Sequence, residues 1–100
     1  MAPENKNELK NILKQKINEL GNYLMDNCEN ETKKKEIHDS LNDLPLYKLY
    51  MFICFIDENK INNHINEFIK IYNLNDTFEL REKLKDYLKY FIEIKNILKS

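Results

Sequence analysis

Residues 41–56 read Leu-Asn-Asp-Leu-Pro-Leu-Tyr-Lys-Leu-Tyr-Met-Phe-Ile-Cys-Phe-Ile. Pro45 ends a helix that arrives from its N-terminal side, because it has no amide hydrogen and its ring clashes with the preceding turn. At the first turn of the next helix a proline is tolerated. We therefore expect two helices that are separated at Pro45, the second running from about Leu46 to Ile56. This second helix is apolar nearly all round, so it must be covered on both sides.

The sequence of the N-terminal part of the chain predicts a helix that can cover one of these two sides of the central helix. Between Glu4 and Asp26 the apolar residues recur at helical spacing, and the remaining positions are polar. These apolar residues are Leu9, Ile12, Leu13, Ile17, Leu20, Tyr23 and Leu24. We expect this amphipathic helix to pack on the side of the central helix that carries Tyr50, Met51 and Cys54. A dimerisation helix or a partner-binding helix is the alternative.

Two further helices are indicated by capping residues. Asn30 or Thr32 can cap a helix that runs up to Pro45. The run Asp76-Thr77-Phe78-Glu79 has the spacing of a capping box, with a side-chain oxygen followed by Glu three residues later, and it opens a last helix of about 23 residues.

The segment between the central and last helices is the least regular. Residues 57–67 are polar and rich in Asn, which indicates a loop, with a helical turn around Ile61 to Ile65 as an alternative within it. Phe68 to Tyr72 alternates Ile69 and Ile71 with Lys70, which favours a short strand, with a helix as the alternative. The predicted fold is therefore all-α: a small helical bundle of about four helices with one short strand-like loop segment.

Composition limits the classes of function. A chain of 100 residues forms about one domain, and one Gly and two Pro leave little material for the hairpins of an all-β fold. The net charge is −1 and Arg81 is the single arginine, so we expect no direct binding to nucleic acid. No apolar run reaches the roughly 18 residues of a membrane span, so we expect no membrane partner.

Two cysteines, Cys28 and Cys54, lack metal-ligand spacing, which indicates a reducing compartment and predicts no metal site and no cofactor. The polar start Met1-Ala2-Pro3-Glu4 is unlike a signal peptide. We expect an intracellular protein, in the nucleus or a viral factory rather than secreted. The abundance of Lys, Asn and Ile is typical of an AT-rich genome.

The order of four sequence pieces resembles a known family. They are Leu41-Asn42-Asp43-Leu44-Pro45, then Leu49 with Phe52 to Ile56, then Ile69 to Leu74, then Leu80-Arg81-Glu82 with Leu84, Tyr87 and Leu88. Residues 33–88 resemble the ET or NET (extra-terminal) domain of bromodomain-and-extra-terminal chromatin proteins and related transcription subunits. By this resemblance the chain divides into an N-terminal helix, residues 1–31, packed on an ET-like domain, residues 32–100, with an extended C-terminal helix.

The resemblance implies a three-helix core whose loop strand captures a short peptide of a transcription or chromatin protein by strand addition. The strand Phe68 to Tyr72 would supply backbone groups, and apolar side chains would line a slot for the peptide. The peptide-binding residues expected on this basis are Ile53, Ile56, Glu67, Phe68, Ile69, Lys70, Ile71, Tyr72 and Leu74.

The chain carries no phosphate-binding glycine loop and no Cys-His or Ser-His-Asp arrangement at helical spacing, so we expect no enzymatic activity. The alternative function is that of a structural or self-associating helical protein, such as a small viral or intracellular oligomer. In that case exposed apolar faces would meet in a homodimer or larger assembly.

Overall fold

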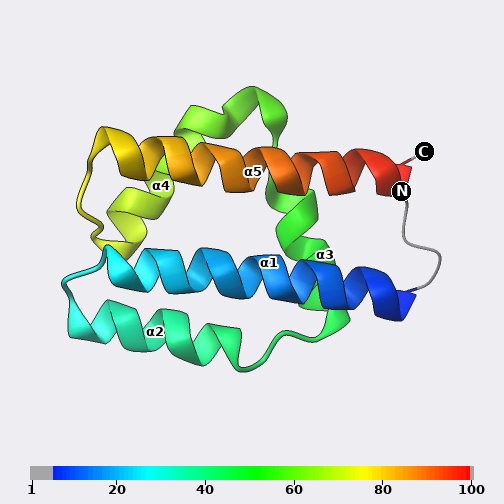
Figure 1. The fold of residues 1–100 in the computed structure, drawn as a ribbon, viewed down its shortest axis with the longest axis horizontal. Coiled ribbons are helices and arrows are strands. Elements are labelled where there is room, and N and C mark those ends of the chain that lie inside the picture. The colour runs from blue at the N-terminus through cyan, green and yellow to red at the C-terminus, as the bar shows by residue number, and fades with distance from the viewer. Residues whose placement is uncertain (1–5, 100) are drawn as a thin grey trace.

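The structure is a computed structural model that describes residues 6–99 (Figure 1). Within this range the chain forms five α-helices and one 3-10 turn. They are α1 (Lys6–Asp26), α2 (Glu31–Leu41), α3 (Leu46–Phe55), the turn η1 (Glu58–Lys60), α4 (Ile61–Tyr72) and α5 (Phe78–Lys99). The all-α class is confirmed, whereas the expected number of about four helices is wrong.

The helices form two layers. In Figure 1, α1 and α5 run antiparallel, and α2 returns antiparallel to α1, while α3 and α4 cross behind them. α1 packs on α2, α3 and α5, and α4 packs on α5. The two longest helices therefore form the frame against which the other three are placed.

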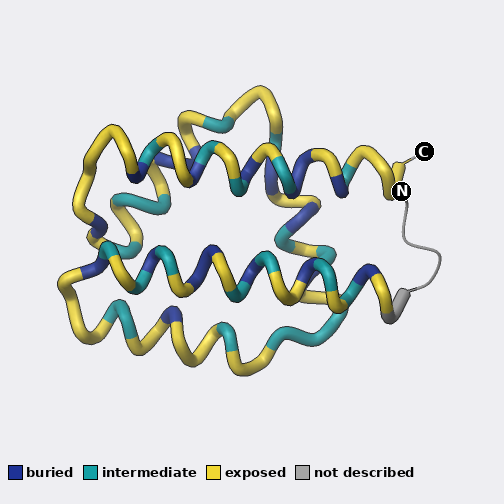
Figure 2. The backbone as a smooth tube through the Cα atoms, in the orientation of Figure 1, coloured by how far each residue is buried: buried dark blue, intermediate teal, exposed yellow. Residues whose placement is uncertain are grey.

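The core lies along the facing sides of α1 and α5. Buried positions recur along both helices in Figure 2. In α1 they are Leu9, Leu13, Ile17, Leu20 and Leu24, and in α5 they are Leu80, Leu84, Leu88, Phe91, Ile92 and Ile94. In α1 the steps are of three and four residues, as the sequence predicts, and in α5 the same spacing holds from Leu80 to Phe91, with Ile92 and Ile94 beside that stripe.

The helix boundaries at α2 and α3 agree with the sequence. Asn30 caps α2, because its side-chain oxygen accepts a hydrogen bond from the amide of Lys33 at 3.0 Å. α2 ends at Leu41, and Pro45 occupies the N-cap position of α3 with extended backbone. The expected separation of two helices at Pro45 is confirmed.

The predicted strand from Phe68 to Tyr72 is wrong. These residues form the second half of α4, and most of the predicted loop 57–67 is helical as well. Residues 61, 65, 68, 69 and 72 are apolar at steps of four, three, one and three, which places them on one helical face. The alternative, a helix, is what forms, because α4 packs on α5. This contact is distant in sequence, so a five-residue window around Ile69 and Ile71 does not include it.

α4 ends in a conformation that few residues adopt. Asn73 has φ 52° and ψ 54°, in the left-handed region, and the amide of Leu74 donates to the carbonyl of Ile69 at 3.0 Å. Apart from Gly, which has no side chain, Asn is one of the residues that tolerate this region best. The chain then forms a single backbone bridge between Leu74 and Cys28, which fastens the end of α4 to the end of α1.

Two polar contacts fix α5. The Thr77 hydroxyl accepts a hydrogen bond from the amide of Leu80 at 3.1 Å, so the cap lies within the predicted Asp76 to Glu79 run, at Thr77. Near the other end, the Lys95 ammonium donates to the carbonyl of Ile56 at 2.7 Å, just after α3. This bond satisfies a carbonyl at the end of a helix.

Candidate functional site

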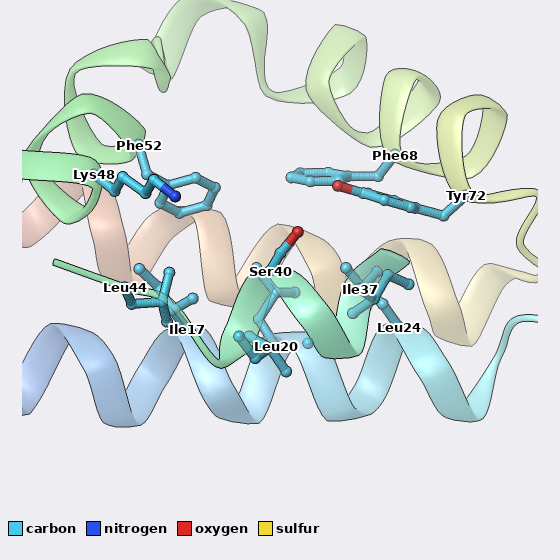
Figure 3. A pocket seen from close by; sticks show the side chains of 12 residues that line it. Ile17, Leu20, Leu24, Ile37, Ser40, Leu44, Lys48, Phe52, Phe68 and Tyr72 are labelled. Atoms are coloured by element: carbon cyan, nitrogen blue, oxygen red, sulfur yellow. The ribbon is translucent and has the colours of Figure 1, made fainter. Parts of the chain in front are cut away.

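A hollow of about 220 Å³ opens between α2, α3 and α4, with α1 beneath it (Figure 3). Its lining is almost wholly apolar. The lining residues are Ile17, Leu20, Gly21 and Leu24 of α1; Ile37, Ser40 and Leu41 of α2; Leu44; Lys48 and Phe52 of α3; and Phe68 and Tyr72 of α4. We call this hollow the α2–α4 groove.

The groove exists because α2 and α4 are held by different neighbours. α2 packs on α1, and α4 packs on α5, so side chains fill the space between them only in part. Gly21 lets α2 come close to α1, since a Cβ atom on this residue would lie 2.5 Å from Cδ1 of Leu41. The lack of a side chain at Gly21 therefore sets how closely α2 lies on α1 beside the groove.

Aromatic rings form the wall on the α4 side. Phe68 and Tyr72 stack with ring centroids 6.2 Å apart and planes at 17°. Phe52 faces them from α3 in Figure 3, and its ring rests edge-on against Phe91 of the core at 5.1 Å. Burial raises the pKa of Tyr72, and the negative charge of Glu36 on α2 raises it further, so this phenol is neutral in the groove.

A second, smaller hollow of about 210 Å³ lies between α3 and α4. Phe52, Phe68 and Tyr72 line both, and the additional residues of the smaller hollow are Phe55, His64, Glu67 and Ile71. We call it the His64 hollow. The aromatic wall stands between the two hollows, and we call the pair of hollows the apolar depression.

The outward face of α3 borders this depression. Tyr47, Met51 and Phe55 are 62%, 65% and 56% exposed. Their spacing of four residues makes one stripe along the helix. The N-terminal helix was expected to cover the side of α3 that carries Tyr50, Met51 and Cys54. This expectation is wrong for Met51 and Cys54, which are exposed, whereas Tyr50 is half-buried against the core. α1 and α5 both pack on α3, in which Leu49 and Ile53 are buried.

The structure separates the nine expected peptide-binding residues into three groups. Glu67, Phe68, Ile71 and Tyr72 line the depression. Ile53, Ile56 and Leu74 are buried in the core, so they line no slot. Ile69 and Lys70 line neither hollow, since Ile69 packs against the core and Lys70 is exposed. The backbone of Phe68 to Tyr72 lies within α4 and is no free strand edge.

The site residues expected from the sequence do not include those that line the hollows from α2 and α3, above all Leu41, Phe52 and Phe55. His64 was expected in a loop. The helical spacing of Ile61, Ile65, Phe68 and Tyr72 is the signal that could have found α4 and its wall. No local pattern indicates the residues of α2, because their place in the groove depends on how α2 packs on α1.

Within residues 6–99 no three His, Cys, Asp or Glu side chains are grouped so that they could hold a metal ion. None of the described helices combines the length and the apolar character that crossing a membrane requires. Comparison with family models, with curated proteins and with solved structures finds no match to this chain.

Proposed function

We propose that this protein is a non-enzymatic interaction module that binds a short amphipathic helix of a partner protein in the α2–α4 groove. The observation that carries the proposal is the apolar depression itself, which is formed by side chains from four helices and open to solvent. An open apolar depression of this kind is typical of a binding surface.

The shape of the surface favours a helical ligand. Strand addition needs free backbone groups at a sheet edge, whereas the backbone groups of α4 are bonded within the helix. A groove between helices accepts side chains at positions i, i+3 and i+7 of an amphipathic helix. This replaces strand addition as the proposed mode of capture.

The rim of the groove is polar. Ser40 is exposed on the α2 side, and Lys48 forms an ion pair with Asp43 at 3.2 Å on the α3 side. A ligand helix can therefore bury its apolar face and keep its polar face in solvent. We expect a dissociation constant in the micromolar range, about −8 kcal/mol, because ordering the peptide offsets part of the apolar contact energy.

The proposed biological setting is transcription or chromatin regulation, inside the cell. It is supported by the ET-like order of sequence pieces from Lys33 to Leu88. The ET resemblance is retained for these pieces, without the strand.

A library of amphipathic 14-residue helical peptides, varied at the apolar positions and displayed on phage, tests the proposal. Selected peptides should bind in the micromolar range and shift amide signals of α2, α3 and α4. Ser40→Arg places a long charged side chain at the rim and should weaken binding at least tenfold. Thr32→Arg adds the same side chain at an exposed position of α2 outside the groove and should leave the affinity unchanged.

Two results would contradict the proposal. One is a selection that yields no peptide better than a sequence-scrambled control. The other is equal affinity of the two arginine variants for the selected peptides, which would place binding elsewhere on the surface.

The second candidate function is self-association. The exposed stripe of Tyr47, Met51 and Phe55 favours it, because the same stripe on a second copy is a complementary apolar surface. The two candidate functions predict different masses in solution: a monomer if the protein binds a partner helix, and a dimer or larger assembly if it self-associates.

A further inference from the structure

The His64 hollow is lined mainly by aromatic side chains. Four of its seven lining residues are Phe or Tyr, and Ile71 adds an aliphatic side chain that is 51% exposed. The aromatic residues are Phe52 and Phe55 of α3 and Phe68 and Tyr72 of α4. A ligand group that enters this hollow therefore meets mainly aromatic and aliphatic surface.

One carboxylate lies among these apolar side chains. Glu67 is exposed and lines the hollow, and it forms no ion pair or hydrogen bond within the described part of the chain. Lys70, three residues further along α4, does not line the hollow. Lys48 lines only the neighbouring α2–α4 groove and is paired with Asp43 at 3.2 Å. The charge of Glu67 is thus left free for a ligand.

The other two polar residues of the lining add no charge. Nε2 of His64 accepts a hydrogen bond from the amide of Asp57 at 3.0 Å, which requires the lone pair of an uncharged ring. Burial raises the pKa of Tyr72, so its phenol is uncharged as well. The hollow therefore carries one negative charge, and a cationic ligand group complements it.

Aromatic surface beside one free carboxylate suits a guanidinium better than an ammonium. A guanidinium is planar, stacks on aromatic rings, is weakly hydrated, and binds a carboxylate through two parallel N–H bonds. An ammonium is strongly hydrated and has three donors, for which the hollow offers the carboxylate of Glu67 alone. The apolar stem of an arginine can also lie along the rings.

The hollow adjoins the surface that we propose for the partner helix. Phe52, Phe68 and Tyr72 line both hollows, and Figure 3 shows their side chains above the α2–α4 groove. A helix in the groove therefore contacts the same wall that lines the His64 hollow. A long side chain at the border of its apolar face is the kind that extends past this wall.

We infer that the His64 hollow binds the guanidinium of an arginine on the partner helix, with Glu67 as its carboxylate partner and the surrounding rings as its apolar contact. This inference rests on the proposed function, since it names the side chain by which the protein selects among amphipathic helices.

Three small probes with the same butyl stem test the chemistry: butylguanidinium, butylammonium and the uncharged butylurea. Each is titrated into ¹⁵N-labelled protein at constant ionic strength, and the amide signals of Phe55, Glu67 and Ile71 are followed. Butylguanidinium should shift them in a saturable way and bind at least fivefold more tightly than either of the other probes. Added salt should weaken its binding, because part of the attraction is between charges.

Glu67→Gln connects the preference to the carboxylate. It changes an exposed residue and should weaken butylguanidinium binding at least fivefold while leaving butylurea binding unchanged. Glu93→Gln is the matched control, since it removes the same charge from an exposed position of α5 that lines neither hollow. Glu93→Gln should leave the affinity for all three probes unchanged.

Phe55→Leu connects the preference to the rings. It keeps an apolar side chain but removes an aromatic ring that is 56% exposed, and it should weaken butylguanidinium binding at least threefold. Tyr47→Leu makes a similar change at an exposed position of the same helix outside both hollows and should have no effect. Melting curves show whether each variant retains its fold, and Glu67→Gln suffices if Phe55→Leu unfolds.

The inference is overturned if butylammonium or butylurea binds as tightly as butylguanidinium, or if Glu67→Gln binds butylguanidinium normally. In either case phage-selected helices that still bind in a manner sensitive to Ser40→Arg leave the proposed function intact. If the inference holds, the selected helices should carry an arginine beside their apolar face, and its replacement by lysine should weaken their binding to the natural sequence but not to Glu67→Gln.

Discussion

Arg81, the single arginine of the chain, links α5 to α4 by hydrogen bonds of its side chain. Its guanidinium donates to both carboxylate oxygens of Asp76, at 2.7 and 2.8 Å, and to the side-chain oxygen of Asn66 on α4 at 2.9 Å. The fork geometry of arginine suits this bidentate pair, which a lysine cannot reproduce. The hydrogen bonds from Arg81, and its positive charge, hold the pKa of Asp76 below the ordinary value for an aspartate.

This lowered pKa predicts a pH dependence with a definite sign. Because the folded state favours the charged carboxylate, the pair stabilises the fold above the ordinary Asp pKa, and this contribution is lost as pH falls through the lowered value. In Arg81→Gln the pKa of Asp76 should rise to the ordinary range, as measured by NMR titration of its carboxyl carbon. Arg81→Lys should give an intermediate pKa. An unchanged pKa in Arg81→Gln would show that the pair does not form in solution.

At the scale of elements, the close approach of α1 and α2 controls the width of the groove. Gly21→Ala raises the helix propensity of α1 by about 1 kcal/mol, but its Cβ would lie 2.5 Å from Cδ1 of Leu41. The end of the Leu41 side chain must move, and both residues line the groove. We expect stability within about 1 kcal/mol of the natural sequence, together with weaker binding of the selected peptides.

Urea unfolding and peptide titration measure these two effects separately. Asn22→Ala is the matched control, since Asn22 is the exposed neighbour of Gly21 on α1 and lines no part of the groove. Asn22→Ala should leave peptide affinity unchanged. If Gly21→Ala also binds peptides normally, then Leu41 does not set the width of the groove.

The elements also show what the sequence can and cannot predict. Asn30, Pro45 and the Asp76 to Glu79 run mark helix ends by local chemistry, and the structure has helix ends at these places. At Phe68 to Tyr72 the strand is favoured because the Ile69 to Ile71 alternation satisfies a strand pattern locally, whereas the helix, the alternative, depends on the packing of α4 on the distant α5. The left-handed Asn73 that ends α4 gives no stronger local signal than the other Asn residues around it.

At the scale of the whole molecule, the candidate site likewise depends on contacts between distant segments, which local sequence patterns do not indicate. Four of the expected peptide-binding residues line the depression, although they were expected as parts of a strand or its flank and lie instead on one helix. They are Glu67, Phe68, Ile71 and Tyr72. Ile53 and Ile56 were predicted to be accessible but are buried, since an apolar helix does not indicate which of its faces meets the core. A groove that is formed by four helices depends on how they pack together, so no single segment of the sequence predicts it.

The exposed stripe on α3 makes a prediction about the size of the protein in solution. α3 has ten residues and is therefore about 15 Å long, so its outward face is short. A stable dimer usually buries about 1,200–2,000 Å² in total, which is more than two such faces supply on their own. We expect sedimentation equilibrium to give the monomer mass of 12.2 kDa at concentrations up to about 100 μM.

Met51→Lys places a charge at the centre of the stripe. Its sedimentation, compared with that of the natural sequence, shows whether the stripe is a contact between two copies. With a monomeric protein it should leave the sedimentation unchanged, because the stripe then meets solvent in both proteins. A dimer that forms below about 10 μM, at about −7 kcal/mol, and dissociates in Met51→Lys would instead favour self-association. The His64 hollow would then border the dimer interface, because Phe55 belongs both to the stripe and to this hollow.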